Sequence, residues 1–183
     1  NLMPFSDPAL NINYFNLAEG MTVADFGAGS GAYTLALARR VGPRGLVYAI
    51  DIQKELLTRL ARESGDLGLR NIVEIILGNL EETNGTKLAD SSVDFVVIAN
   101  LLFQTSAKYT LVCEAKRILK AGAKIALVDW SGSFGGIGPK PDQVLLPAEA
   151  KKIFAEAGFA FLNDFPAGDH HYGLMFGAAP AKP

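Results

Sequence analysis

Cysteine is almost absent from the chain, and long apolar runs are absent as well. Cys113 is the one cysteine among 183 residues, which excludes an intrachain disulfide and a cysteine-based zinc cluster. Apolar runs reach strand length only, as in 95–99, so no segment is expected to span a membrane. Residues 1–10 have no basic start and hold two prolines, which does not fit a signal peptide. We therefore predict a cytoplasmic protein.

An excess of basic residues is also missing. The chain has 17 Lys and Arg against 19 Asp and Glu, a formal net charge of −2. This balance predicts no binding to duplex nucleic acid. With 49% hydrophobic and 20% charged residues, residues 1–183 are expected to fold as a single domain.

Strand-like and helix-like segments alternate along the chain. Most of the strand-like segments are near-continuous apolar runs, typical of a parallel sheet covered by helices on both faces. No helix separates the last two strands, so these should pair as an antiparallel hairpin. We predict an α/β, Rossmann-like, doubly wound sheet of seven strands, mostly parallel with the last strand antiparallel. The expected strands are 21–26, 46–51, 72–77, 93–99, 124–129, 159–165 and 172–178, and the expected helices are 31–41, 53–64, 107–120 and 147–158.

A glycine-rich turn follows the first strand. Gly27, Gly29 and Gly31 allow a tight turn and a close approach of the backbone to a ligand. The helix that follows points free amide groups at the same place. Asp51 comes 20 positions after Gly31, at the end of the next strand, where a carboxylate can accept hydrogen bonds from ribose hydroxyls. The pattern predicts a nucleoside site.

Asp25 distinguishes two classes of nucleoside cofactor. Gly27, Gly29 and Ala32 formally satisfy a dinucleotide fingerprint. The run from Asp25 to Gly31 also fits Asp-x-Gly-x-Gly-x-Gly in full. A carboxylate at the mouth of the turn would repel a pyrophosphate and would suit the cationic end of an amino-acid-bearing nucleoside.

From Glu19 onward the sequence resembles the class I S-adenosylmethionine-dependent methyltransferases. Residues 19–31 resemble the first motif of that family, 48–51 its ribose-binding loop, 78–80 its adenine-binding turn and 93–103 its fourth motif. The small ubiquinone and menaquinone biosynthesis enzymes are the most similar group. The resemblance implies a core over 19–183, with 1–18 near the active site. It implies S-adenosylmethionine as cofactor, held by Asp25, Gly27, Ala28, Gly29, Gly31, Asp51, Ile52, Asn79, Leu80 and Asn100.

Three departures from related enzymes narrow the chemistry. Asn100 is not followed by two prolines, which argues against methylation of the amino groups of DNA bases. Asp129 is followed by Trp130 where metal-dependent catechol-type enzymes carry Asp-Asn, so no catalytic magnesium and no other metal is expected. Arsenite methylation needs several thiols, and Cys113 is the one available.

Asp129 and His171 are the candidate catalytic residues. Asp129 ends the fifth strand and could orient or deprotonate an acceptor, or could instead cap a helix or pair within a loop. A histidine such as His171 titrates near pH 6.5 and could act as a general base. We expect the turn of the final hairpin on the side of the sheet away from the cofactor, which favours a structural role for His170 and His171.

The predicted function is methyl transfer from S-adenosylmethionine to an acceptor that the sequence does not identify. A small molecule is expected because the charge is slightly negative and no nucleic-acid module is present. Two alternatives remain open: a non-catalytic module that binds S-adenosylmethionine or a partner, and an NAD-dependent oxidoreductase. The sequence does not indicate an oligomeric state.

Overall fold

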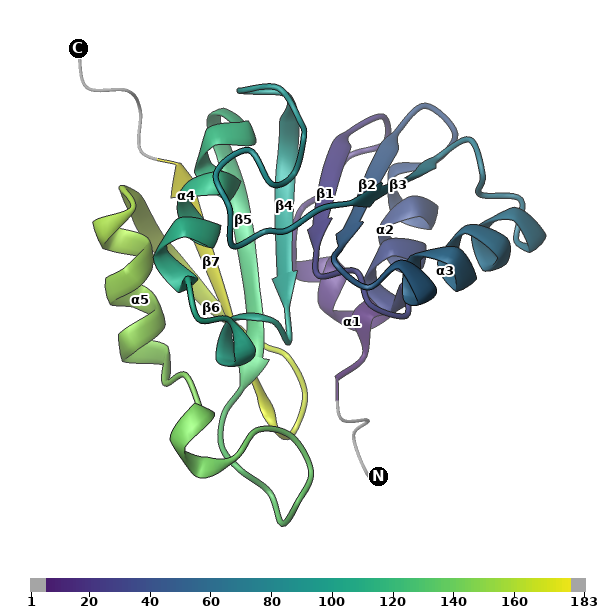
Figure 1. Cartoon of the computed structure of the whole chain (residues 1–183). Helices are drawn as coiled ribbons and strands as arrows, with labels where there is room; N and C mark the ends of the chain where they lie inside the picture. The colour runs from purple at the N-terminus through teal and green to yellow at the C-terminus, as the bar shows by residue number, and fades with distance from the viewer. Residues whose placement is uncertain (1–5, 179–183) are drawn as a thin grey trace.

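The structure is a computed structural model in which residues 6–178 are described. One seven-stranded sheet runs through it in the order β3-β2-β1-β4-β5-β7-β6 (Figure 1). The strands are β1 (Thr22–Phe26), β2 (Leu46–Asp51), β3 (Val73–Leu77), β4 (Val93–Ala99), β5 (Leu119–Trp130), β6 (Phe159–Pro166) and β7 (His171–Ala178). The α-helices are α1 (Pro8–Asn11), α2 (Ala32–Val41), α3 (Lys54–Asp66), α4 (Lys108–Ile118) and α5 (Pro147–Glu156), and the 3₁₀ helices are η1 (Ile12–Tyr14), η2 (Leu102–Gln104) and η3 (Pro141–Gln143).

The strand directions confirm the predicted fold class. Strands β1 to β5 pair in parallel, whereas β7 is antiparallel to both β5 and β6. The extent of the predicted domain beyond 6–178 lies outside the described residues.

Helices cover both faces of the sheet because alternate strand residues point to opposite sides. On β4, Phe95 and Val97 belong to one apolar cluster, which also takes residues from α2, α3, η1 and the segment after η1. Val96 and Ile98 belong to the other cluster, which includes residues of α4 and α5. Figure 1 shows these two groups of helices on opposite sides of the molecule.

The junction between α4 and β5 differs from the prediction. The helix ends at Ile118 rather than at 120, and the strand begins at once with Leu119 rather than at 124. Leu119 is buried and pairs with Val93, while Lys124 pairs with Phe95, so 120–123 form an irregularity in the ladder. Burial of Leu119 in the core therefore outweighs the helical pattern that continues past it.

The prediction for the final hairpin turn was wrong. Residue 171 pairs with residue 130 at the end of β5, and the Ser131 amide donates to the carbonyl of His170 over 2.9 Å. Because β7 runs antiparallel to β5, it begins where β5 ends. The turn at 167–170 consequently lies at the carboxyl edge of the sheet, the same edge that carries the glycine-rich turn.

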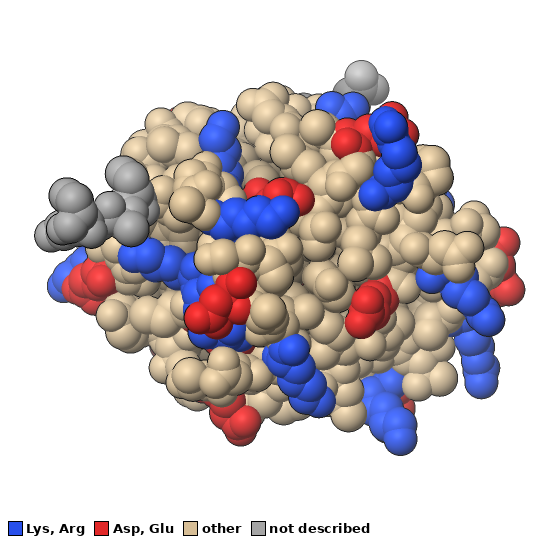
Figure 2. Space-filling view, turned by 90° about the horizontal axis from the view of Figure 1, so that it is seen from above, with Lys and Arg blue, Asp and Glu red and all other residues tan. Residues whose placement is uncertain are grey.

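Charges of both signs are mixed on the face opposite that edge. Figure 2 looks down on this face and shows blue and red side chains interspersed over tan ones, with no field of one sign. Within the described residues, no helix is both long enough and apolar enough to cross a membrane.

Candidate functional site

A cleft of about 460 Å³ opens at the carboxyl ends of β1, β2 and β4. This volume falls within the roughly 300–1,000 Å³ that small-molecule sites occupy. The sequence-predicted residues that line it are Asp25, Gly27, Ala28, Gly29, Asp51, Ile52, Asn79, Leu80 and Asn100. Gly31 is the predicted residue that does not line the cleft.

Gly31 serves packing instead. Its φ is +89°, and a Cβ built on it would stand 2.2 Å from Leu60 Cδ1 of α3. Glycine is therefore needed at this position so that α2 can begin with α3 packed closely against it. The other two glycines of this turn face β2: the amide of Gly27 donates to the carbonyl of Ile50 over 2.9 Å, and the amide of Gly29, whose φ is +52°, donates to Asp51.

Asp51 is held at the tip of β2 by two backbone amides. Its Oδ2 accepts from the amide of Gly29 and its Oδ1 from the amide of Gln53, both over 2.8 Å. Each carboxylate oxygen retains a further lone pair. Asp51 is thus oriented before any ligand arrives and can still accept hydrogen bonds from hydroxyl groups.

Asp25 lies at the floor of the cleft and is 2% exposed. The hydroxyl of Thr34 donates to its Oδ2 over 2.6 Å. Burial raises the pKa of Asp25 to about 6, and the nearby charge of Asp51 adds to the increase. A cationic group brought beside Asp25 would favour its charged form.

The turn after β3 forms another wall of the cleft. Asn79 Oδ1 accepts from the amide of Glu81 over 3.1 Å, and Asn79 Nδ2 donates to Glu82 Oε1 over 2.8 Å. The side-chain oxygen predicted to accept from an adenine amine therefore already stabilises its own turn. It keeps one lone pair for a ligand.

Glu81 was missed by the sequence interpretation. Its Oε1 accepts from the amides of Ser106 and Ala107, over 2.6 and 3.3 Å, immediately before α4. Hydrogen bonds from these two amides lower the pKa of Glu81. Glu81 thereby ties the turn after β3 to the segment that supplies Gln104, Thr105 and Leu111 to the cleft. No local pattern signals a contact between residues this far apart in sequence.

Asn100 ends the cleft on the β4 side. Its φ is +53°, and its amide donates to the carbonyl of Val128 over 2.9 Å. Its side-chain Oδ1 is buried without a hydrogen-bond partner among the described residues. Such an atom in a folded protein calls for an explanation by function or by a bound molecule.

The charge of the cleft has one sign. Its lining includes the carboxylates of Asp25, Asp51 and Glu81, and no Lys, Arg or His of residues 6–178 is part of it. A ligand that carries a positive charge is favoured in such surroundings, and a polyanion is disfavoured.

Asp129, a predicted catalytic residue, does not line this cleft. It is 1% exposed, and its two oxygens accept from the amides of Phe103 and Trp130, over 3.1 and 2.8 Å. Burial raises the pKa of Asp129 to about 6. Phe103 lies in η2 between Leu101, just before that helix, and Gln104, its last residue, and both of these line the cleft. Asp129 therefore anchors one wall of the cleft.

His171 does not line the cleft either, although it lies at the same edge of the sheet. Its ring is buried, 4.3 Å from the ring of Trp130, and the ring of His170 lies 4.1 Å from Phe134. These two ring pairs lie near the end of β5 and the start of β7. The structure therefore brings the predicted cofactor residues together and leaves both predicted catalytic residues beside them.

Comparisons with known proteins agree with this geometry. A family model described as a methyltransferase domain matches residues 24–127, more than half of the chain. The crystal structure of a SAM-dependent methyltransferase from Aquifex aeolicus is 32% identical, with a TM-score of 0.86, over 96% of this chain and 91% of that one.

Two curated relatives differ in the substrates that their names give. The ubiquinone/menaquinone biosynthesis C-methyltransferase UbiE of Bordetella avium is 30% identical over 85% of this chain and 60% of its own length. An arsenite methyltransferase of Halobacterium salinarum is 28% identical over 82% of this chain and 40% of its own length. The chain spans about half the length of the curated relatives it matches.

Proposed function

Because the chain belongs to the methyltransferase-domain family, we propose that it transfers a methyl group from S-adenosylmethionine to a small-molecule acceptor. The observation that carries the proposal is the cleft at the glycine-rich turn, which is lined by Asp25 and Asp51 and by no cationic side chain of residues 6–178. The negative charge of this lining also favours S-adenosylmethionine over NAD.

S-adenosylmethionine fits the residues present. Asp51, fixed by the amides of Gly29 and Gln53, offers its remaining lone pairs to the ribose hydroxyls. Ile52, 64% exposed at the rim, offers an apolar surface to the adenine beside Asn79 and Leu80. Asp25 offers its charge to the ammonium of the amino acid. These roles are the ones that the family resemblance implies for the same residues, which line one cleft in the fold.

An NAD-dependent oxidoreductase fits less well. A pyrophosphate at the turn would meet the carboxylate of Asp25 without a cation in the lining to offset the repulsion. In the glycine-rich turn before α2, the amide of Gly29 is also not free to bind a phosphate, because it donates to Asp51. The electrostatics therefore favour the cationic cofactor.

In methyl transfer from a sulfonium, the main contribution of the protein is to position the two reactants. When bound, S-adenosylmethionine supplies a methyl carbon activated by its positive sulfur. The residues of the chain hold the nucleoside in one orientation, keep water away and align the acceptor, which is where most of the rate increase of such a transfer originates. Asp129 contributes by holding η2 in place. His171, which lies at the same edge of the sheet, is the candidate proton acceptor.

The acceptor is proposed from the relatives and from the composition. The UbiE relative points to quinol-like compounds. The arsenite methyltransferase relative points to a metalloid. Binding of arsenite needs several thiols, however, and Cys113 is the single thiol of the chain. A quinol-like molecule is therefore the first acceptor to test.

Calorimetric titration of the full chain tests the cofactor. S-adenosylmethionine and S-adenosylhomocysteine are expected to bind, and NAD far more weakly. NAD binding tighter than either sulfur nucleoside contradicts the proposal. Incubation with labelled S-adenosylmethionine and a panel of quinol, amine, thiol and arsenite acceptors then tests transfer, with Asp51→Ala as the control that should lose it. Binding without transfer to any class would favour a non-catalytic module.

A further inference from the structure

The amino acid of the cofactor carries a carboxylate, and no cationic side chain of the described residues lines the cleft to bind it. The ammonium of this amino acid can approach Asp25, but the carboxylate meets a lining that already holds three carboxylates and no Lys, Arg or His of residues 6–178. A carboxylate taken from water into such a site needs hydrogen-bond donors, because otherwise its desolvation is uncompensated. The donors must therefore be neutral groups.

Tyr33 has the properties of such a donor. It lies in the first turn of α2, lines the cleft and is buried. Burial raises the pKa of its hydroxyl, so the group keeps its hydrogen at physiological pH. The hydroxyl of Thr105, also in the lining, is by contrast engaged, since it donates to the carbonyl of Leu101 over 2.9 Å.

Asn11 sets the direction of the tyrosine hydroxyl. Its side-chain amide nitrogen donates to the oxygen of Tyr33 over 2.7 Å. An amide NH₂ can only donate, so the hydrogen of the phenol is not used in this contact and is available to a further acceptor. Ser6 Oγ lies 3.4 Å from the same phenol oxygen, and either hydroxyl can donate in this longer contact. A ligand carboxylate would therefore compete with Ser6 Oγ for the phenol hydrogen, and as a charged acceptor it makes the stronger hydrogen bond.

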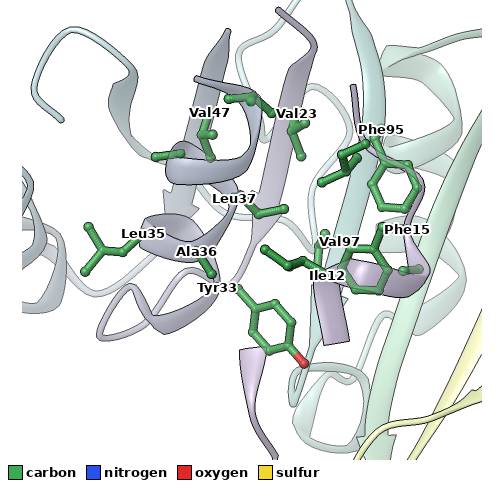
Figure 3. Packing of buried hydrophobic residues seen from close by; sticks show 14 of the residues in the cluster. Ile12, Phe15, Val23, Tyr33, Leu35, Ala36, Leu37, Val47, Phe95 and Val97 are labelled. Atoms are coloured by element: carbon green, nitrogen blue, oxygen red, sulfur yellow. The ribbon is translucent and has the colours of Figure 1, made fainter. Parts of the chain in front are cut away.

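Asn11 itself is fixed by its surroundings. It is 3% exposed, and its amide nitrogen also lies within 3.1 Å of Ser6 Oγ and 3.4 Å of the carbonyl of Ala167 in the turn between β6 and β7. Figure 3 shows Tyr33 projecting from α2 beside Ile12, in the cluster to which Phe15 also belongs. One side chain thus connects the N-terminal segment, α2 and the final hairpin.

We propose that Tyr33, held by Asn11, donates its hydroxyl hydrogen to the carboxylate of the cofactor's amino acid, so that the N-terminal segment completes the binding site. The inference rests on the proposed function. Tyr33 is the binding residue, and Asn11 is a positioning residue that acts through it. In this subsite the hydroxyl of Tyr33 takes the role that a cationic side chain would otherwise have in binding the carboxylate.

Two ligands that differ in the amino acid test the proposal. S-adenosylhomocysteine carries the carboxylate, whereas methylthioadenosine has the same nucleoside and thioether but no amino acid. Titration calorimetry of the full chain with both ligands compares the parent with Tyr33→Phe, which removes only the hydroxyl, and with Asn11→Leu. Tyr172→Phe is the matched control, because this half-buried tyrosine donates to the carbonyl of Leu145 over 2.8 Å and does not line the cleft.

Tyr33→Phe is expected to bind S-adenosylhomocysteine about tenfold more weakly or worse, the effect of one lost hydrogen bond to a charged group. Its affinity for methylthioadenosine should stay within about twofold of the parent. Asn11→Leu should shift the first ligand in the same direction, and Tyr172→Phe should shift neither.

Equal losses for both ligands in Tyr33→Phe would overturn the subsite, since Tyr33 would then only shape the cleft. An unchanged affinity for S-adenosylhomocysteine would overturn it as well. If the parent binds neither ligand, the proposed function fails first and the subsite fails with it. The two failures are therefore distinguishable.

Discussion

The carboxylate of Asp51 accepts a hydrogen bond from the backbone amide of Gly29 over 2.8 Å. This contact joins the end of β2 to the middle of the glycine-rich turn, so the two parts of the proposed nucleoside site are fixed relative to each other before a ligand binds. Preorganisation of this kind lowers the entropic cost of binding. The contact also means that a change at Asp51 affects the turn as well as the ligand.

Asp51→Ala should weaken binding of S-adenosylhomocysteine by roughly 1–3 kcal/mol, because charge-assisted hydrogen bonds to the ribose are left unmade. Calorimetric titration measures the change, and circular dichroism checks that the fold is kept. Asp51→Asn, which keeps one acceptor oxygen, should lose less. Coincident isotherms for Asp51→Ala and the parent would show that Asp51 is not the ribose ligand.

Binding of S-adenosylhomocysteine should weaken as the pH falls below about 6. Burial raises the pKa of Asp25 to about 6, so the carboxylate is charged above this pH and protonated below it. Only the charged form attracts the ammonium of the ligand, and uptake of one proton reduces affinity by up to about tenfold per pH unit. Titrations from pH 8 to 5 measure the slope.

Asp25→Asn is the control for this pH dependence. It should bind weakly at every pH and show a flat profile, while its amide oxygen can still accept from Thr34. A parent profile as flat as that of the variant would exclude Asp25 as the titrating group. The stability that Asp25 contributes has the opposite sense: it is fully present below about pH 3.8 and lost as the pH rises through about 6.

Asp129→Ala should lower the free energy of unfolding by about 1–3 kcal/mol, because the buried amides of Phe103 and Trp130 lose their acceptor. Urea denaturation measures this loss.

The turnover of Asp129→Ala can be measured once the screen has identified an acceptor. Turnover should fall by a larger factor than the affinity for S-adenosylhomocysteine, because η2 is displaced. Chelators should leave turnover unaffected.

His171→Gln tests the competing assignment of a general base. The buried ring packs on Trp130 outside the cleft, so turnover should fall by less than about tenfold. Removal of a general base typically costs about 100-fold or more. A loss of that size at His171, with none at Asp129, would identify His171 rather than Asp129 as the residue on which turnover depends.

Glu114→Ala should destabilise the fold by about 3 kcal/mol, because the buried Thr86 and the half-buried guanidinium of Arg117 lose their charged acceptor. Glu114 is buried and accepts from Arg117, from the hydroxyl of Thr86 and from the amide of Asn84. The exposed Glu63→Ala on α3 is the control, with an expected change within about 0.5 kcal/mol. Equal denaturation midpoints for the two variants would contradict the prediction.

The same residue has a pH signature. Burial raises the pKa of Glu114, but hydrogen bonds from Arg117 and Thr86 outweigh it and lower the value to about 2. A depressed pKa stabilises the folded state above the ordinary value near 4.5, and this contribution is lost as the pH falls through about 2. Acid denaturation of the parent should therefore show a stability loss that Glu114→Ala lacks.

The sequence alone determined the class of the fold, and it indicated the residues of the proposed nucleoside site. Apolar strands alternating with amphipathic helices can be buried only as a covered parallel sheet, and the glycines with Asp25 and Asp51 form a local pattern whose geometry depends on one strand, one turn and the next strand. These features are short-range. They can be read in order along the chain, without knowledge of how distant segments pack.

Tertiary structure decided the rest, because it depends on contacts between residues far apart in sequence. The pairing of β7 with β5 put the hairpin turn at the carboxyl edge, where the sequence placed it on the opposite side. Packing against Leu60 gave Gly31 a structural purpose, and two backbone amides engaged Asp129 away from the cleft. Asn11 reaches Tyr33 and Ala167 only in the folded chain, since hydrogen bonds of this kind are set by strand register and helix packing and leave no periodic trace in the sequence.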